Sequence, residues 1–148
     1  MRKIDEILEY IKDEVELGDK ELKSLDTALN YIEYETPTDL PLVFRRLDSI
    51  ISVSADVSWT LANVKKHRAK INAEYKALKD PQFTSLIRKG RPSTVAIESE
   101  IRFIDDNIAK YEYRIEVLDG FIEYLEYILK VLENIQWAIK DRVSLSKI

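Results

Sequence analysis

The sequence predicts an all-α protein, an elongated helical bundle or coiled coil of two short N-terminal helices followed by two long helices. Only three Gly and four Pro occur in 148 residues, too few for the frequent turns of a β protein. Apolar residues recur at steps of three and four, the spacing of one helical face. The chain contains no Cys, which excludes disulfides and thiolate metal sites. No apolar run approaches the 18 residues of a membrane span, so we expect a cytoplasmic protein without membrane contact.

Two short helices are predicted in residues 1–35, which form an acidic helical hairpin. Gly18 follows the first apolar face and is expected to take the left-handed conformation at the end of that helix. Asp19 is suited to cap the next helix. The two prolines within Thr36–Pro41 then separate the hairpin from the rest of the chain. The first face consists of Ile4, Ile7, Leu8, Ile11 and Val15, and the second of Leu22, Leu25, Leu29 and Ile32.

Residues 36–92 are predicted to hold one long helix with a basic second half and a basic linker. Pro81, Gly90 and Pro92 are expected to break this helix within Asp80–Pro92, and Ser93 or Thr94 to cap the next one. Its apolar seam alternates steps of four and three, with Ser54 and Arg68 as polar interruptions. The seam comprises Ile50, Ser54, Val57, Leu61, Val64, Arg68, Ile71, Tyr75 and Leu78.

Residues 93–148 carry the strongest periodicity, an unbroken heptad seam that predicts a single helix over Ser93–Val143, roughly 75 Å long. A period near 3.5 residues implies left-handed supercoiling against partner helices. A second apolar set (Phe121, Ile128, Val131 and Ile135) widens the stripe, so we expect a homo-oligomer above a dimer. Gly120, beside the seam, marks either a bend or close crossing, or a merely tolerated glycine. The seam comprises Ile97, Ile101, Ile104, Ile108, Tyr111, Ile115, Leu118, Ile122, Leu125, Leu129, Leu132, Gln136, Ile139 and Val143. The residues expected to carry association are Ile115, Leu118, Ile122, Leu125, Ile128, Leu129, Leu132, Ile135 and Ile139.

Charge is sorted along the chain into three blocks. Met1–Val64 has 7 Lys/Arg against 14 Asp/Glu, and Ser93–Ile148 has 7 against 11. Lys65–Pro92 has 9 Lys/Arg against only Glu74 and Asp80, a net charge of +7. Such a concentration in an acidic protein predicts an anionic partner, with nucleic acid as the first candidate. The expected nucleic-acid-binding residues are Lys65, Lys66, Arg68, Lys70, Tyr75, Lys76, Lys79, Arg88, Lys89 and Arg91.

Two questions about this basic block stay open at the level of sequence. Arg68 occupies a seam position, where it either faces a shared surface or pore, or packs its stem and extends its head to solvent. Tyr75, Phe83 and Trp59 offer aromatic rings for stacking bases. A competing interpretation is that the basic block docks onto the acidic blocks of a neighbouring subunit.

No residue pattern assembles a nucleophile, base or metal, so we expect neither an enzyme nor a cofactor or metal ion. His67 is the only histidine and fits a solvated or phosphate-contacting role better than a metal site. Asp105 and Asp106 lie on the polar face of the heptad helix, where a solvated flank is the ordinary explanation. Residues 90–94 either hold an anion at a helix N-terminus or form a plain loop with a capped helix.

Two stretches of the chain resemble the UvsY-like recombination mediators of tailed phages. Arg68-Ala69-Lys70-Ile71, followed by Tyr75, is similar to a basic-Ala-basic-aliphatic element tied to DNA contact. Phe121–Lys140 resembles the family's C-terminal oligomerisation helix, through Leu125-Glu126-Tyr127-Ile128, Leu132-Glu133-Asn134 and Trp137-Ala138-Ile139-Lys140.

The resemblance implies an all-helical, ring-forming protein that binds single-stranded DNA and helps to load a RecA-like recombinase against a single-strand-binding protein. It makes Arg68 and Lys70 the DNA-contacting pair, and it implies the host-cell cytoplasm as the location. The alternative is a structural coiled-coil or adaptor protein, such as a component of a phage particle, whose basic block pairs with acidic protein surfaces.

Overall fold

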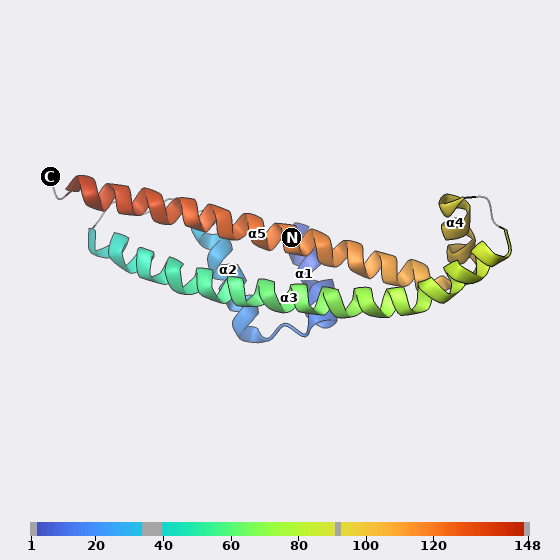
Figure 1. Ribbon diagram of the computed structural model, residues 1–148. Helices are drawn as coiled ribbons and strands as arrows, with labels where there is room; N and C mark the ends of the chain where they lie inside the picture. Colours follow the sequence, from blue (N-terminus) through green and yellow to red (C-terminus); the bar gives the residue numbers. More distant parts are fainter. Residues whose placement is uncertain (1–2, 34–39, 91–92, 147–148) are drawn as a thin grey trace. The chain divides into compact units, whose positions relative to one another are not determined.

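The computed structural model describes residues 3–33, 40–90 and 93–146, and these residues form five α-helices and no strand (Figure 1). The helices are α1 (Lys3–Val15), α2 (Asp19–Glu33), α3 (Leu40–Arg88), α4 (Thr94–Ile104) and α5 (Asp106–Ser146). The predicted all-α class is confirmed. Residues 36–39 of the predicted break, Arg91, Pro92, and the side chains of Ile4, Ile7, Ile104 and Val143 lie outside the described part.

The chain divides into two compact units. Unit 1 comprises Met1–Val64 and Phe121–Ile148, and unit 2 comprises Lys65–Gly120. The units do not follow the three sequence segments, because α3 and α5 each contribute one half to unit 1 and the other half to unit 2. The start of unit 2 coincides with Lys65, the first residue of the basic block.

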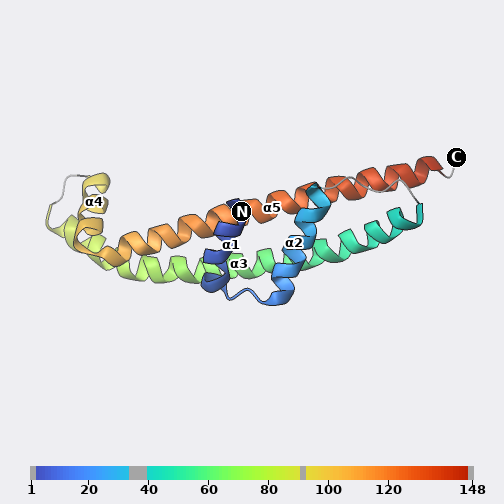
Figure 2. The ribbon, with the colours of Figure 1, turned by 180° about the vertical axis from the view of Figure 1, so that it is seen from behind.

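In unit 1, α3 and α5 lie side by side, and α1 and α2 cross the pair on one side (Figures 1 and 2). The apolar faces of all four helices meet in a core that includes Ile11, Leu25, Val57, Leu125 and Leu132, each at most 2% exposed. The polar interruptions of the two predicted seams meet each other here, because the Gln136 amide Nε2 donates to Ser54 Oγ at 3.3 Å. This hydrogen bond favours one register of α3 against α5, since a slip would leave both groups facing apolar neighbours.

In unit 2, the end of α3, α4 and the start of α5 share a second core. Its buried members are Leu86, Ile97, Ile101 and Ile108, with Tyr75, Leu78 and Phe83 packed against them. The single helix predicted over Ser93–Val143 is therefore wrong, because the chain leaves the helical conformation at Asp105 (φ −126°, ψ 104°). The heptad phase continues across this break because Ile101 and Ile108 reach the same core from α4 and α5.

Asp105 joins these three helices. Its backbone N–H donates to the Ile101 carbonyl at 2.9 Å and ends α4, while its Oδ1 accepts the Asn107 N–H at 2.9 Å and caps α5. Its Oδ2 accepts Gln82 Nε2 of α3 at 3.1 Å. The carboxylate that looked like a solvated flank in the sequence is thus an N-cap with a tertiary contact.

The break predicted at Pro81 does not occur, and α3 continues to Arg88. Pro81 cannot donate to the carbonyl of Ala77, and the neighbouring Gln82 Nε2 donates to the Leu78 carbonyl at 3.1 Å. The helix ends instead at Gly90 (φ 79°), whose N–H donates to the Ile87 carbonyl at 3.0 Å. Ser93 caps α4 as predicted, since its Oγ accepts the Ala96 N–H at 3.1 Å.

Gly18 is predicted to be the left-handed residue at the end of α1. The residue with a left-handed conformation there is Glu16 (φ 56°). The Leu17 N–H reaches back to the Lys12 carbonyl at 3.2 Å, which is the contact of a Schellman end. Gly18 instead precedes α2, where a Cβ would lie 2.8 Å from Glu21 Oε2. At Gly120 a Cβ would meet nothing within 4 Å, so no close crossing explains that glycine.

Candidate nucleic-acid interface

The basic block begins in the second half of α3, continues past the end of that helix at Arg88, and belongs entirely to unit 2. Unit 1 contains 11 Lys/Arg and 18 Asp/Glu, a net charge of −7. Unit 2 contains 12 Lys/Arg and 9 Asp/Glu, a net charge of +3. The separation of charge seen along the sequence is therefore also a separation between the two compact units.

Arg68 is committed to an ion pair within its own chain. Its Nε donates to Asp119 Oδ1 at 2.9 Å and its Nη2 to Oδ2 at 3.3 Å, a two-bond contact between α3 and α5. The side chains are 34% and 49% exposed. The seam arginine therefore does not simply extend its head into solvent, because two of its N–H groups donate to a carboxylate of the same chain.

Lys79 and Tyr75 are also engaged within unit 2. Lys79 Nζ lies 3.3 Å from Glu98 Oε1 of α4 and 5.3 Å from the centre of the Tyr75 ring. Partial burial lowers the pKa of Lys79, but the neighbouring Tyr75 and Glu98 side chains raise it, and the net pKa lies above its ordinary value. Tyr75 is half-buried and packs against the core of unit 2 that includes Leu86.

The other described cations of the block form an exposed surface, which we call the basic face. Its members are Lys65, Lys66, Lys70, Lys76, Arg88 and Lys89, all of them exposed, while Arg91 lies outside the described residues. At 100° per residue, the four lysines from residue 65 to residue 76 fall within an arc of about 140° on α3. Arg68 and Lys79 lie outside this arc, on the packed side of the helix. The four lysines from residue 65 to residue 76 therefore share one side of α3, whereas Lys89 follows the end of the helix.

Small side chains lie between these lysines. Ala69, Ala73 and Ala77 are exposed on the same side of α3, so no large side chain projects from the helix between the lysine ammonium groups. The acidic residues of this part of α3 are Glu74, which accepts a hydrogen bond from the Tyr111 hydroxyl at 3.3 Å, and the exposed Asp80. A polyanion can therefore approach the helix closely over residues 65–77, where its phosphates meet the lysines, whereas the exposed Asp80 adds a negative charge to the same side beyond them.

The structure exposes an aromatic side chain that the sequence pattern did not single out. Phe103 on α4 is 89% exposed, the highest value among the large apolar side chains described. In the sequence it stood inside an apparently continuous heptad helix. Asp105 was the available signal, because an Asp followed by a fresh apolar run is typical of a helix N-cap. Phe103 is the most exposed ring among the described residues of unit 2, and an exposed ring can stack on a base.

Residues weighed for catalysis or metal binding have structural contacts. Asp105 caps α5, and Glu112 accepts three hydrogen bonds from Arg102 at 2.7–3.1 Å. The described residues contain no group of three or more His, Asp or Glu that would hold a metal ion. In the same part of the chain, no helix is long and apolar enough to cross a membrane.

The residues predicted to carry association lie in the cores of the single chain. Leu118, Leu125, Ile128, Leu132 and Ile139 are at most 1% exposed. Ile115, Ile122, Leu129 and Ile135 are half-buried. The heptad periodicity of α5 is therefore largely satisfied by helices of the same chain, and Tyr127 (59% exposed) and Trp137 (58% exposed) are the larger apolar surfaces that α5 presents from unit 1.

Comparison with known proteins returns no match to a family model, to a curated protein or to a solved structure. The similarity to recombination mediators therefore rests on the two sequence stretches alone.

Proposed function

We propose that this chain binds single-stranded DNA through the basic face and acts as a recombination mediator without catalytic chemistry of its own. The observation that carries the proposal is the exposure of Lys65, Lys66, Lys70 and Lys76 on one side of α3, within unit 2. Lys66 and Lys70 lie one turn apart on this side of α3. Spaced cations of this kind neutralise a nucleic-acid backbone without reading its sequence.

The internal ion pairs define the role of Arg68 within this proposal. Because two N–H groups of its guanidinium donate to Asp119, Arg68 positions α3 against α5, and Lys66, Lys70 and Lys76 make the contacts with phosphates. In the motif Arg68-Ala69-Lys70-Ile71, Arg68 then positions the helix and Lys70 contacts a phosphate. Ala69 separates them with a small side chain, and Ile71 packs in the core. Ile71 is 2% exposed, which fits the last of these roles.

The narrower part of the proposal is the loading of a RecA-like recombinase in competition with a single-strand-binding protein, by a homo-oligomer larger than a dimer. The resemblance of Phe121–Lys140 and of the Arg68 motif supports it. If the basic face is repeated around an assembly, one strand can contact the basic faces of several copies at once. With five contacts, the logarithm of affinity would fall with the logarithm of salt with a slope of roughly −3.5.

The test is fluorescence anisotropy of a labelled oligothymidylate strand over a salt series. Lys66→Ala/Lys70→Ala should make the slope less negative by about 1.4, because each lost phosphate contact removes about 0.7. Lys12→Ala/Lys23→Ala removes the same charge from exposed positions of α1 and α2 and should leave the slope unchanged. Binding that is absent at low salt, or equally affected by both double variants, would contradict the proposal.

A second function, that of a structural or adaptor protein, is favoured by the ion pairs themselves. Arg68 and Lys79 of the basic block both form ion pairs with carboxylates of unit 2, which supports pairing of this block with an acidic protein surface. Salt-sensitive self-association, without any retardation of single-stranded DNA at low salt, would favour the adaptor.

A further inference from the structure

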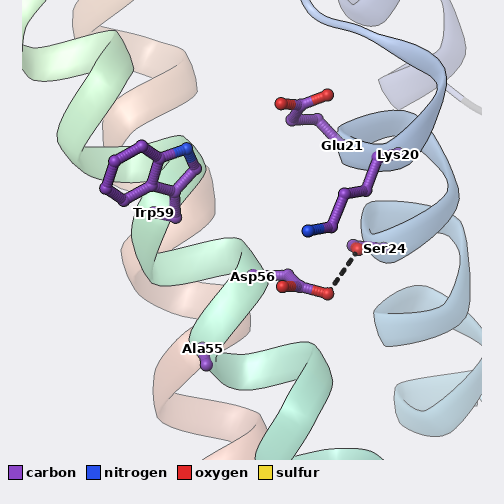
Figure 3. A pocket seen from close by; sticks show the side chains of 6 residues that line it. All are labelled: Lys20, Glu21, Ser24, Ala55, Asp56 and Trp59. Carbon is purple, nitrogen blue, oxygen red and sulfur yellow. Dashed lines mark hydrogen bonds between the residues drawn. The ribbon is translucent and has the colours of Figure 1, made fainter.

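A cleft of about 300 Å³ lies between α2 and α3 within unit 1, separate from the basic face (Figure 3). Residues 20, 21 and 24 of α2 form one wall, and residues 55, 56 and 59 of α3 form the other. Its volume is at the lower end of the range for small-ligand sites, which is suited to one side chain of a partner.

The indole ring of Trp59 is part of the α3 wall of the cleft. The Trp59 side chain is 65% exposed, and Figure 3 shows it across the cleft from Lys20 and Glu21. The other tryptophan of the chain, Trp137, already has Lys140 Nζ 5.1 Å from its ring centre. An indole ring that borders a polar cleft offers the same electron-rich surface to a cation from outside the chain.

A second feature of the cleft is the carboxylate of Asp56, which is held in one orientation. Ser24 is 8% exposed and its Oγ donates to Asp56 Oδ2 at 3.0 Å. This hydrogen bond fixes the carboxylate through one oxygen and leaves Oδ1 as an acceptor. Glu21 adds a second carboxylate, and its side chain reaches back over Gly18, where a Cβ would lie 2.8 Å from Oε2.

The charges of the lining favour a cationic occupant. Glu21 and Asp56 outweigh Lys20, and unit 1 as a whole carries a net charge of −7. Figure 3 shows the Lys20 side chain extending along the cleft toward Asp56, so the cleft already accommodates an aliphatic stem with a cationic head.

We propose that this cleft binds an arginine side chain presented by a basic segment of a partner protein. The guanidinium plane stacks on Trp59 while its N–H groups donate to Asp56 Oδ1, and Glu21 adds negative charge at the other end of the cleft. Arginine fits better than lysine because a planar guanidinium stacks on an indole and donates several hydrogen bonds at once. A nucleic-acid strand fits worse, because its phosphates would meet two carboxylates.

The experiment uses the intrinsic fluorescence of single-tryptophan chains. Trp137→Phe leaves Trp59 as the reporter inside the cleft, and Trp59→Phe leaves Trp137 as the reporter outside it. Hexa-arginine should change the Trp59 emission saturably and leave the Trp137 emission unchanged. Hexa-lysine should bind several-fold more weakly, and hexa-glutamate should not bind.

Two substitutions with matched controls test the named contacts by peptide anisotropy. Trp59→Ala should weaken hexa-arginine binding about tenfold, whereas Trp137→Ala should not weaken it. Asp56→Asn removes the charge but keeps an oxygen for Ser24, and it should weaken binding more than Asp48→Asn, which removes an exposed charge elsewhere on α3.

The proposal is overturned if the paired variants weaken peptide binding equally, because the attraction would then be that of a generally acidic surface. It is also overturned if spermidine matches hexa-arginine, which would indicate a polyamine site, or if an oligothymidylate strand changes Trp59 emission and the peptide does not. Thermal unfolding of each variant verifies that the fold is retained, which the exposure of Trp59 leads us to expect.

Discussion

Arg102 of α4 and Glu112 of α5 form a two-pronged ion pair with distances of 2.7–3.1 Å in unit 2. Hydrogen bonds from Arg102 hold the pKa of Glu112 below its ordinary value of 4.5, against the smaller opposing effect of partial burial. A carboxyl group whose pKa is lower in the folded state stabilises the fold above its unfolded pKa. That stabilisation is lost as the pH falls through the folded pKa.

We therefore expect the unfolding free energy of the native chain to fall more steeply between about pH 5 and pH 3 than that of Glu112→Gln. The difference at neutral pH should be about 0.5 kcal/mol, because the Arg102 side chain is 51% exposed and solvent screens the pair. Urea unfolding at several pH values measures both quantities. Glu116→Gln, which removes an exposed carboxylate of α5 outside this pair, is the control, and a parallel pH dependence in native chain and Glu112→Gln would refute the expectation.

At the scale of the element, α3 contains a proline in the middle of its hydrogen-bonded ladder. Pro81 is exposed, so Pro81→Ala creates no cavity and restores the N–H that the Ala77 carbonyl lacks. We expect this substitution to raise the unfolding free energy of unit 2 by about 1–2 kcal/mol, the gain in helix propensity less the added entropy of the unfolded chain. Amide hydrogen exchange over residues 77–88 should slow by a corresponding factor.

Asp80→Ala is the matched control for Pro81→Ala, since it changes the adjacent exposed position of the same helix without adding a backbone donor. It should leave exchange over these residues nearly unchanged. If Pro81→Ala lowered stability, the interruption at residue 81 would itself be required for the packing of α3 against α4.

The elements also show where sequence reasoning succeeds and where it stops. The apolar periodicity predicted the helices and their buried faces, because a helix in a small protein must bury one side. It could not separate α4 from α5, since Ile101 and Ile108 keep a spacing of seven on both sides of Asp105 while packing into one cluster. Likewise, the sequence exposed Arg68 as a charge within a seam, but its partner Asp119 lies 51 positions later and beside the other seam.

At the scale of the molecule, the internal use of the heptad seam changes how self-association must be tested. Buried seam residues such as Leu125 and Leu132 support the fold of one chain, so their replacement would unfold unit 1 and reveal nothing about assembly. The exposed aromatic side chains of α5 are the better probes. Tyr127 and Trp137 project large apolar surfaces that a second chain would cover in an oligomer.

We expect sedimentation velocity at micromolar concentration to give a mass above that of two chains. Tyr127→Asp/Trp137→Asp should reduce it to a single chain, because each new carboxylate would be buried without a partner in the assembled state. The helical circular dichroism should stay unchanged, since both positions are exposed within one chain.

The same experiment with DNA tests strand binding by the assembly. A labelled oligothymidylate strand should sediment with the native assembly. The strand should bind the double variant more weakly, because fewer basic faces then act on one strand. A native chain that sediments as a monomer with and without the strand would contradict the ring-like assembly, while strand binding by that monomer would leave the basic face as the site of contact.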